Sequence, residues 1–546
     1  MEHIGRKFLF VMTILTVSIY PLMAQGNGSG GWFGYGLIFV AVIVILGAVV
    51  VVSESLLKVE AKRAGVDLQK DNSGLFGGFN NPFRSKFPKY LRGEKLHLLK
   101  KGHDIKLEAG AKASKPELIH TTRYALQPTN YRGIRPIPKL EVEEGQDVLA
   151  GQPIFYDKEH PEIKYVSPVS GEFVELNRGE KRAITELVIL ADKEDIKYKE
   201  IPSFDVKGSD RTALKQHLMA YGAWPLFNER PFDRIPNPEQ DPKSIFVTTF
   251  DSSPLAPDFG IIVEGKEAEF QQGLDVLNEL TDGKVYLGLD ARGREQPHAA
   301  FAEAKNVEKH WFRGPHPSGN VGVHIHHVDP IRTGETVWTV DVQNVITLGG
   351  MFLHHKFIAD RTIALVGNGL KEPKYIKTIA GANVGELLTS NLQEGGNRII
   401  NGNVLVGDVK NENQYIDFNT RQITVIPEGD YYEAFGWLIP GALRPTVSRS
   451  YPSFLFPDLE FKADTNSHGE RRAFVVTGQY EKLLPMDIYL QHLLKSIMIN
   501  DFERMEGLGI LELSEEDVAL AEFACTSKIP LQQILREGLD YVQTQM

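Results

Sequence analysis

The sequence predicts a multidomain α+β protein with an N-terminal transmembrane helix, and three observations support this fold class. Residues 35–52 form one uncharged apolar run, residues 104–200 alternate short apolar patterns with Gly and Pro turns, and residues from 241 onward alternate strand-like and helix-like patterns. A chain of 546 residues is long enough for several domains with separate cores. We therefore expect a signal peptide or first span (1–24), a transmembrane helix (35–54), a linker (55–103), a barrel-sandwich domain (104–200), a helical connector (201–240), an α/β domain (241–380), a β-grasp module (381–440) and a C-terminal helical domain (441–546).

The composition excludes several functional classes. The formal net charge of −11 argues against nucleic-acid binding, because that function needs a clustered basic surface. Cys525 is the only cysteine of the sequence. This chain alone therefore forms no internal disulfide, no iron–sulfur cluster with four thiolate ligands and no zinc site built on paired cysteines.

Two apolar runs open the chain. The first, "FLFVMTILTVSIYPLMA", follows two basic residues and ends in small residues, which is typical of a signal peptide or a short first span. The second, "YGLIFVAVIVILGAVVVV", is long enough to cross the hydrocarbon core of a bilayer, which is roughly 30 Å thick. We expect the second run to be a membrane span.

Charges beside these runs predict the orientation. The segment between the runs, "QGNGSGGWFG", has no charge, whereas basic residues lie on the outer side of both runs (Arg6, Lys7, Lys58, Lys62 and Arg63). Positive residues stay in the cytoplasm, so we expect an N-terminal anchor in a bacterial inner membrane with the body on the cytoplasmic side. Residues 71–90 show no periodicity and read as part of a linker near the membrane surface, where Arg84, Lys86 and Lys89 either contact anionic lipid or stay solvated.

The first domain of the body resembles a biotinyl- or lipoyl-carrier barrel. The elements "EGQDV", "AGQP" and "SPVSG" occur in that order between residues 142 and 171. Lys158 lies where such a domain carries its modified lysine, but the following "EHPEIKY" makes the hairpin connection too long for a carrier tip. We expect the carrier scaffold with an unmodified lysine.

The segments that follow predict a helix, an aromatic strap and a Rossmann-like α/β domain. Apolar residues in 210–221 recur at helical spacing, and "WPLFNERPFDRIP" interleaves rings with arginines, which suits either an interdomain strap or a pocket for a flat ring. "SIFVTTFDSSPLAPD", "EAEFQQGLDVLNELT" and "KVYLGLD" read as strand, helix and strand. This domain has no Gly-x-Gly-x-x-Gly turn between a strand and a helix, so a dinucleotide site is not expected.

A histidine-rich segment, "HPSGNVGVHIHHVDP", spans residues 316–330. On a strand, His324 and His326 would point to one face and could bind a metal together, but Asp329 is the one further ligand nearby. We favour turn and packing roles for the histidines from His316 to His327, and we assign no metal site and no catalytic residue.

The carboxyl third of the sequence predicts a β-grasp module and helices. "GANVGELL" reads as a short helix, and "NRIINGNVLVGDV" and "RQITVIPEG" read as strands. Helical patterns follow in "PMDIYLQHLLKSIM" and from "LSEEDVAL" onward, where Ser514 and Asp517 have capping-box spacing.

In combination, several motifs are similar to those of one family, the A subunit of the bacterial Na+-translocating NADH:quinone reductase. They span roughly residues 105–536 and comprise "YRGIRP", "SPVSGEF" with "NRGEKR", "RPFDRIP", "SIFV", "HPSGNVGVHIHHVDP", "GANVGEL", "FGWLIPG", "LPMDI" and "LELSEEDVAL". The family resembles the C subunit of the Rnf ferredoxin:NAD oxidoreductase, whose Gly-rich flavin and NADH loop and cysteine clusters are missing here. The N-terminal extension departs from the family pattern.

The resemblance implies a cofactor-free, cytoplasmic-side subunit of an enzyme complex that passes electrons from NADH to a quinone while exporting Na+. It implies that flavins and an iron–sulfur centre are held by partner subunits and that this chain has no complete active site. Two alternatives remain. An Rnf-type C-like subunit is disfavoured by the cysteine count, and a membrane adaptor or carrier protein would need a long coiled-coil hairpin or a modified Lys158.

The resemblance also implies contact with ubiquinone or menaquinone. Two segments, "YRGIRP" (131–136) and "FNERPF" (227–232), have rings that could stack on a quinone and arginines that could donate to its carbonyl oxygens. The candidate quinone contacts are Tyr131, Arg132, Arg135, Phe227, Arg230 and Phe232.

Overall fold

The structure is a computed structural model that describes residues 41, 42, 45, 88–134, 138–193, 195–433, 435, 444–447, 453, 456 and 458–545. The chain divides into two compact units, Met1–Phe87 and Pro88–Met546. In the first unit, residues 41, 42 and 45 are helical. The expected signal peptide (1–24) lies outside the described residues, as does the expected transmembrane helix (35–54) apart from these three. No helix within the described ranges is long and apolar enough to span a membrane.

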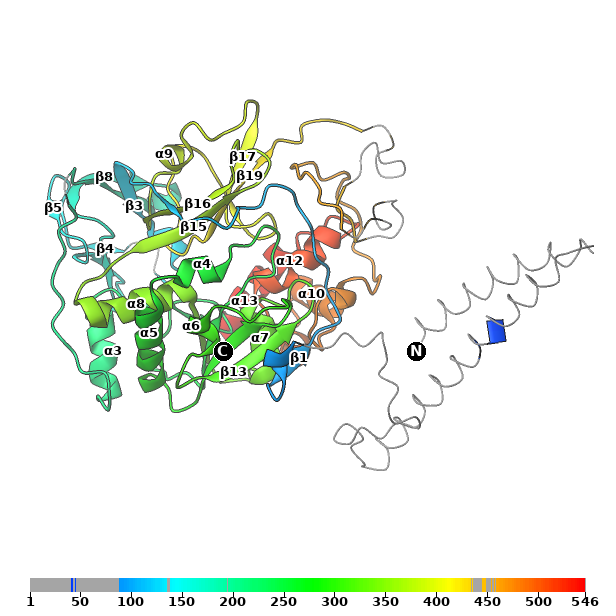
Figure 1. Ribbon diagram of the computed structural model, residues 1–546, viewed down its shortest axis with the longest axis horizontal. Helices are drawn as coiled ribbons and strands as arrows, with labels where there is room; N and C mark the ends of the chain where they lie inside the picture. Colours follow the sequence, from blue (N-terminus) through cyan, green and yellow to red (C-terminus); the bar gives the residue numbers. More distant parts are fainter. Residues whose placement is uncertain are drawn as a thin grey trace, which may run out of the picture. The chain divides into compact units, whose positions relative to one another are not determined.

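The second unit is built around a six-stranded sheet in the order β1-β13-β12-β11-β14-β10. Figure 1 labels two neighbouring strands of this sheet, β1 and β13. All its neighbouring strands are parallel except β10, which runs antiparallel to β14. Most residues of the central strands β11, β12 and β14 are buried, because both faces of this sheet are covered. The strands are β1 (Leu96–Leu98), β10 (Phe227–Arg230), β11 (Ile245–Thr248), β12 (Val285–Asp290), β13 (Glu308–Arg313) and β14 (Val337–Asp341).

Alternating side chains of β11 show which helices cover each face. Ile245 and Val247 share a core with α5 (Glu267–Glu279) and α8 (Val342–His354), whereas Phe246 packs with α7 (Val321–Val328). Helices α5 and α8 lie side by side (Figure 1), and a Cβ atom at Gly273 or Gly349 would lie closer than 3.0 Å to the backbone of the other helix. The shorter helices of this region are α3 (Arg211–Ala220), α4 (Phe259–Val263) and α6 (Ala299–Ala302).

A barrel-sandwich domain precedes β10 in the chain. One of its sheets has the order β3-β9-β8-β5 and the other β4-β6-β7. Lys158 is exposed in the turn between β6 and β7, where the Glu159 amide donates to Asp157 Oδ1 at 3.0 Å. The strands are β3 (Arg123–Leu126), β4 (Lys139–Leu140), β5 (Asp147–Val148), β6 (Pro153–Tyr156), β7 (Lys164–Val166), β8 (Gly171–Arg178) and β9 (Ile184–Ala191).

A second six-stranded sheet, of order β18-β17-β19-β15-β16-β2, follows the α/β helices. The expected helix in "GANVGELL" is α9 (Val384–Leu388), and the expected strands after it are present, which confirms these predictions. The Rossmann-like domain was expected to extend to residue 380, but β15 and β16 pair in this second sheet. The strands are β2 (Glu117–Leu118), β15 (Asp360–Val366), β16 (Lys374–Ile379), β17 (Asn397–Asn401), β18 (Asp408–Lys410) and β19 (Gln422–Pro427).

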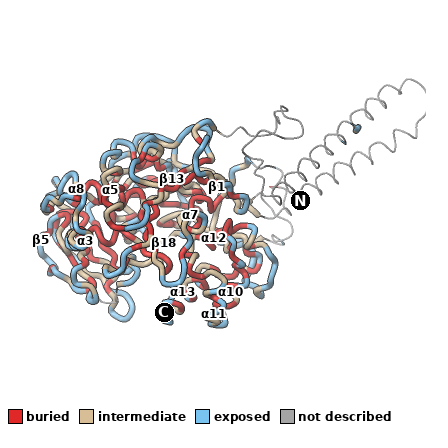
Figure 2. The backbone as a smooth tube through the Cα atoms, turned by 90° about the horizontal axis from the view of Figure 1, so that it is seen from below, coloured by how far each residue is buried: buried red, intermediate tan, exposed pale blue. Residues whose placement is uncertain are grey.

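The carboxyl end is helical, with α10 (Leu490–Met498), α11 (Phe502–Gly507), α12 (Glu515–Ala524) and α13 (Leu531–Gln545). The capping box of Ser514 and Asp517 is present at the start of α12, as predicted. The core of these helices includes Phe250, Phe312 and Val323 of the α/β domain. Buried segments therefore continue from the sheets into the helices (Figure 2).

The end of the predicted linker differs from the structure. Residues 96–98 form β1, an edge strand of the first sheet, although they precede the rest of that sheet by more than a hundred residues. Tyr90 packs on Trp311 with ring centroids 5.2 Å apart, and Trp311 Nε1 donates to Glu94 at 3.1 Å. Local composition could not reveal this pairing, because the partner strand is distant in sequence.

Candidate functional site

The carboxyl ends of β11 and β14 define a crevice in the first sheet. From β11 the chain goes to β12 and β13 on one side, and then crosses back to β14 on the other side of β11. The connections that leave β11 and β14 therefore run in opposite directions along the sheet, and a crevice opens between them. Open α/β sheets bind their ligands in such a crevice. A cavity of about 320 Å³ lies here.

Several parts of the chain line this cavity. The first sheet contributes Thr248, Phe250 and Asp251 at and after the end of β11, Thr339, Val340 and Asp341 of β14, and Asn228 and Arg230 of β10. Loops of the second sheet contribute Asn403, Leu405, Val406 and Arg421, the start of α12 contributes Glu515 and Glu516, the segment after β3 contributes Arg132, and the turn after β10 contributes Asp233. The cavity therefore forms only when these parts are packed together.

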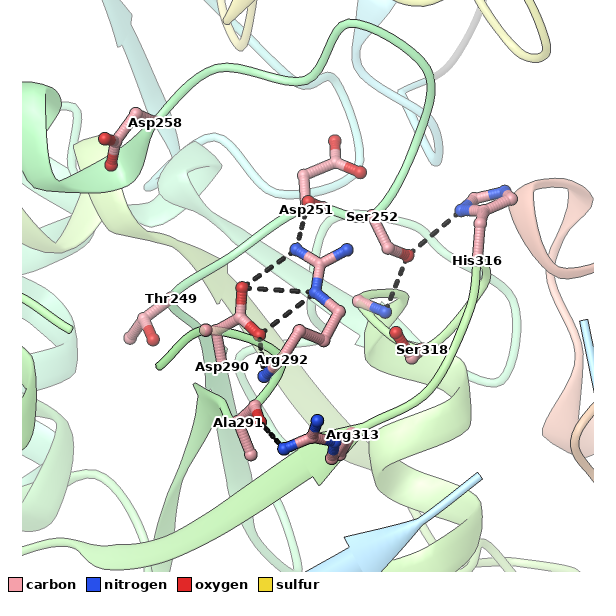
Figure 3. Close-up of polar contacts among 12 residues, drawn as sticks. Thr249, Asp251, Ser252, Asp258, Asp290, Ala291, Arg292, Arg313, His316 and Ser318 are labelled. Atoms are coloured by element: carbon pink, nitrogen blue, oxygen red, sulfur yellow. Dashed lines mark hydrogen bonds and ion pairs between the residues drawn. The ribbon is translucent and has the colours of Figure 1, made fainter. Parts of the chain in front are cut away.

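The loop after β11 is held by polar contacts (Figure 3). Arg292 forms an ion pair with Asp290 at 2.8 Å and donates to the Asp251 carbonyl at 3.3 Å. Ser252 Oγ accepts from the Gly319 amide at 2.8 Å and lies 3.0 Å from His316 Nδ1. Since the Ser252 oxygen accepts the amide proton, its own hydroxyl proton is available for His316.

Arg132 and Arg230 lie on the same wall of the cavity. Arg132 contacts Asp233 at 3.2 Å and Glu515 at 2.7 Å. Arg230 is buried and contacts Asp233 through Nε at 3.5 Å and Glu516 through Nη2 at 3.1 Å. Asp233 therefore lies between the two guanidinium groups.

Arg421, which comes from the second sheet, bridges the carboxyl ends of β11 and β14. Its guanidinium lies 3.0 Å from Asp341 and 3.8 Å from Asp251. Next to it, Asn344 donates to Asn419 at 3.0 Å and accepts from Arg361 at 2.7 Å. These contacts fix the polar groups that surround the ends of β11 and β14.

Two cavity-lining residues have a buried polar atom without a polar partner in the described part of the chain. The atoms are Ser253 Oγ and His316 Nε2; Arg230 Nε also lacks a hydrogen bond, but Asp233 lies 3.5 Å from it. A buried polar atom that lacks a partner costs about 1–3 kcal/mol, so such atoms usually have a ligand or water beside them. The position of these atoms at the cavity indicates that it takes a polar occupant.

The pKa values at this wall reflect burial first and an excess of carboxyl groups second. Burial raises the pKa of Glu516 to about 7; Asp517 and Asp233 add to this, whereas Arg230 and Arg421 oppose it. Burial also raises the pKa of Asp517, against the effect of Arg230. Burial acts to lower the pKa of Arg230, but the surrounding carboxylates raise it overall, so the guanidinium stays charged. Near neutral pH, the carboxyl groups therefore gain or lose protons, whereas Arg230 does not.

The structure brings only some of the predicted quinone contacts together. Arg132 and Arg230 line the cavity. Tyr131 instead packs on Tyr165, with ring centroids 4.9 Å apart, beside a separate small void.

The other predicted contacts lie elsewhere. Phe227 is buried between Trp224 and Trp338, and Phe232 belongs to the core of the C-terminal helices. Arg135 lies outside the described residues. The segment "FNERPF" is thus an edge strand and a turn rather than a free strap, and its phenylalanines do not present their rings to the cavity.

Most of the cavity residues were not predicted from the sequence, among them Phe250, Asp251, Arg421 and Glu516. A signal existed for two of them, because Phe250 and Asp251 directly follow a predicted central strand, where ligands of α/β sheets bind. Arg421 and Glu516 come from distant segments, and nothing local indicates that they meet there.

The strand assumed for the histidine segment is wrong, because residues 321–328 form helix α7. On a helix, His324 and His326 point to different sides. His324 Nε2 lies 2.9 Å from the Ser318 carbonyl oxygen, and His326 Nδ1 contacts Glu512 at 2.6 Å. These contacts give the histidines packing and hydrogen-bonding roles.

Comparisons with known proteins agree with this domain order. Family models match residues 98–192 (NqrA N-terminal barrel-sandwich hybrid domain), 209–357 (NqrA second alpha/beta domain) and 362–411 (NQRA C-terminal domain). The A subunit of the Na(+)-translocating NADH-quinone reductase of Alcanivorax borkumensis is 37% identical over 82% of this chain and 99% of the relative. The proteins of the same name from Vibrio atlanticus and Saccharophagus degradans are 35% and 36% identical over the same shares.

Among solved structures, a NAD+-reducing [NiFe]-hydrogenase in the air-oxidized state aligns with 64% of this chain and with 71% of the hydrogenase chain. The TM-score is 0.31 and the sequence identity is 11%, and this similarity is too weak to support an inference about function. The fold is that of a multidomain protein with a barrel-sandwich domain, an α/β domain and a ligand-sized cavity at the carboxyl edge of its sheet. The chain belongs to the NqrA family, the A subunits of the Na+-translocating NADH-quinone reductases.

Proposed function

We propose that this chain acts as the A subunit of a Na+-translocating NADH-quinone reductase and supports electron transfer from NADH to a quinone coupled to Na+ export. The observation that carries this proposal is the similarity of the chain to named A subunits over 99% of their length. Other subunits of such a complex are its partners. The body lies on the cytoplasmic side of a bacterial inner membrane, tethered by the N-terminal apolar run.

The flavins and the iron–sulfur centre belong to partner subunits in this proposal. The single cysteine of the chain supports this, because a four-thiolate cluster needs more cysteines than the chain has. The loop between β11 and α4 has no Gly-x-Gly-x-x-Gly turn to bring backbone amides to a pyrophosphate. The excess of carboxylates at the cavity also disfavours a phosphate-bearing ligand, since like charges repel.

The crevice cavity is the proposed contact site for the quinone headgroup. A quinone ring is neutral, flat and carries two carbonyl oxygens that accept hydrogen bonds. Arg132 and Arg230 place guanidinium donors on one wall, and Phe250, Val340 and Val406 supply apolar surface for the ring. Ubiquinone and menaquinone share these features, so the same site suits either.

The first test is purification of the full complex from native membranes through a carboxyl-terminal tag, followed by an assay of Na+-stimulated NADH:ubiquinone-1 reduction. We expect partner subunits that bear flavin to co-purify with this activity. A chain that purifies alone, or with partners that lack NADH:quinone reductase activity, would contradict the proposal.

The cavity is tested by a bulky substitution at its rim. Val406 lines the cavity and is 39% exposed, so Val406→Trp fills space there with little change to the core. Val409, on β18, is 63% exposed and does not line the cavity, so Val409→Trp is the matched control. We expect Val406→Trp to raise the KM for ubiquinone-1 by about tenfold or more, which is the effect of losing roughly 1.4 kcal/mol of binding, and Val409→Trp to leave KM unchanged. Equal KM values in both variants would place the quinone elsewhere.

A further inference from the structure

Glu516 has a distinct position among the acidic groups of the cavity wall. It is the second residue of α12, its carboxylate lies 3.1 Å from Arg230 Nη2, and 34% of its side chain is accessible. Because Glu516 lines the cavity, an occupant can reach this carboxyl group. It therefore combines contact with a buried cation and access to the ligand space.

The neighbouring carboxyl groups have other partners. Asp517 is buried and accepts from the Ser514 amide at 2.9 Å and from Asn320 Nδ2 at 3.4 Å. Glu515 is paired with Arg132 at 2.7 Å and lies 3.7 Å from Arg536. Neither of them is placed as Glu516 is, with access to the ligand space and Arg230 as its cation.

Carboxyl groups outnumber guanidinium groups at this wall. Five carboxyl groups (Asp233, Glu515, Glu516, Asp517 and Asp540) contact three guanidinium groups (Arg132, Arg230 and Arg536). Arg421, which also acts on Glu516, is shared between Asp251 and Asp341. Adjacent carboxyl groups disfavour one another's ionised form, and burial together with Asp517 and Asp233 raises the pKa of Glu516 to about 7, so Glu516 keeps its proton in part of the molecules near neutral pH.

We propose that Glu516 contacts the quinone headgroup and is its proton donor: its carboxyl hydrogen-bonds a quinone carbonyl oxygen and transfers its proton there when the ring is reduced. This inference rests on the proposed quinone site. The electrons come from a reduced flavin of a partner subunit, which is oxidised as the quinone is reduced.

The proton-transfer step balances in atoms and charge. Two electrons enter the ring, the Oε–H bond of Glu516 breaks and an O–H bond forms on the carbonyl oxygen, while the second proton comes from solvent. The Glu516 carboxylate that remains is stabilised by Arg230 at 3.1 Å, and it takes a new proton from water before the next turnover.

The test uses the purified complex and the affinity of ubiquinone-1 as a function of pH. In the unsubstituted protein, Glu516 loses its proton as the pH rises above about 7, and a carboxylate then faces a carbonyl oxygen. We expect the affinity to fall as the pH rises from about 6 to about 9. Glu516→Gln keeps an N–H donor at every pH, so its affinity should not vary with pH in this range, while kcat should fall by at least about tenfold because the proton donor is gone.

Two further variants make the result specific. Glu537, on α13, is exposed and accepts from Gln533 at 2.9 Å, so Glu537→Gln controls for loss of one negative charge and should keep the pH profile of the unsubstituted complex. Glu516→Asp keeps a titratable carboxyl group and should restore both part of kcat and a pH dependence. If Glu516→Gln prevents assembly, a shifted pH profile in Glu516→Asp supports the proposal and an unshifted profile overturns it.

Comparing Val406→Trp with Glu516→Gln distinguishes a wrong proton donor from a wrong quinone site. If Val406→Trp raises the KM for ubiquinone-1 but Glu516→Gln keeps the pH profile and kcat of the unsubstituted complex, the proton-donor role is overturned and the site stands. If neither Val406→Trp nor Glu516→Gln has an effect, the quinone does not occupy this cavity and both are overturned.

Discussion

Gly322 lies directly against the carboxylate of Asp517. A Cβ atom at Gly322 would lie closer than 3.0 Å to both carboxylate oxygens. Gly322 is in the first turn of α7, and Asp517 is in the first turn of α12, so a negative charge lies at the amino-terminal end of α7. That placement stabilises α7 through its macrodipole and joins the C-terminal helices to the α/β domain.

This contact predicts that Gly322→Ala destabilises the protein. The added methyl group must push a buried carboxylate away from Ser514 and Asn320, and overpacking of this kind costs about 1–3 kcal/mol. Gly507→Ala, in α11, is the control because no atom lies within 4 Å of its Cβ position. Urea unfolding of both variants measures the difference; equal midpoints would show that α7 and α12 adjust to the methyl group without loss.

Adjacent glycines of α8 provide a second test. A Cβ atom at Gly349 would clash with the Glu269 carbonyl oxygen of α5, whereas a Cβ atom at Gly350 would have its nearest neighbour, His354 Cδ2, at 3.7 Å. We expect Gly349→Ala to lower the free energy of unfolding by about 2 kcal/mol or more, because the helices must move apart. Gly350→Ala should raise it by up to about 1 kcal/mol, since Ala favours a helix more than Gly does. Thermal unfolding should therefore shift in opposite directions.

The pair His97 and His310 predicts a loss of stability in acid. His97 Nε2 lies 2.9 Å from His310 Nδ1, and His310 Nε2 lies 3.1 Å from Glu308. When both rings are neutral, His310 donates from Nε2 to the carboxylate and accepts at Nδ1 from His97. Burial lowers the pKa of His97 from 6.5 to about 4, helped by His310, His327 and Lys95, and burial also lowers the pKa of His310.

The sign of the effect follows from proton binding. Between pH 6.5 and about 4, the unfolded chain binds a proton at His97 that the folded chain does not bind, and the lowered pKa of His310 acts in the same direction. Their contribution to stability is therefore complete above pH 6.5 and is lost as the pH falls toward 4. His97→Phe keeps the stacking on Phe312 but cannot titrate, so it should lose less stability over this range than the unsubstituted protein does. The free energy of unfolding is measured by urea unfolding at several pH values for both proteins. If it falls equally with pH in His97→Phe and in the unsubstituted protein, this account of the pair is wrong.

Cys525 predicts a simple probe of the C-terminal helices. The thiol is buried, its sulfur lies 2.8 Å from the Tyr480 hydroxyl, and the Ile529 amide donates to it. We expect iodoacetamide to label the folded protein slowly and the urea-unfolded protein completely, as mass spectrometry would show. Ser114→Cys, at an exposed position, should react at once and serves as the control. Rapid labelling of Cys525 in the folded protein would mean that the helices open readily.

Local patterns were sufficient for much of the fold. The strand, helix and strand predicted around 245–290 are β11, α5 and β12, because their apolar periodicities are strong and turns bound them. The prediction for the histidine segment failed because a short apolar run with alternating histidines fits either a strand or a helix, and only its packing against Phe246 and Phe312 decides. Strands β1 and β10 were missed because they are short and gain stability from partners far along the chain.

The candidate site was predictable in part. The pattern of arginines beside aromatic residues named Arg132 and Arg230 as quinone contacts; both line the cavity, but the rings of that pattern belong to the core. The acidic partners could not be foreseen, because the contact between Arg230 and Glu516 joins residues that are nearly three hundred positions apart.

The two edges of the first sheet have a consequence for how the chain can be divided. The barrel-sandwich domain is inserted between β1 and β10, which form opposite edges of one sheet, so its two ends are bound to the same platform. A shortened chain that starts at residue 209, where the α/β family match begins, would leave the edge of β13 without its partner strand. An open edge of this kind recruits strands from other molecules, and such a fragment should aggregate unless residues 96–98 are restored.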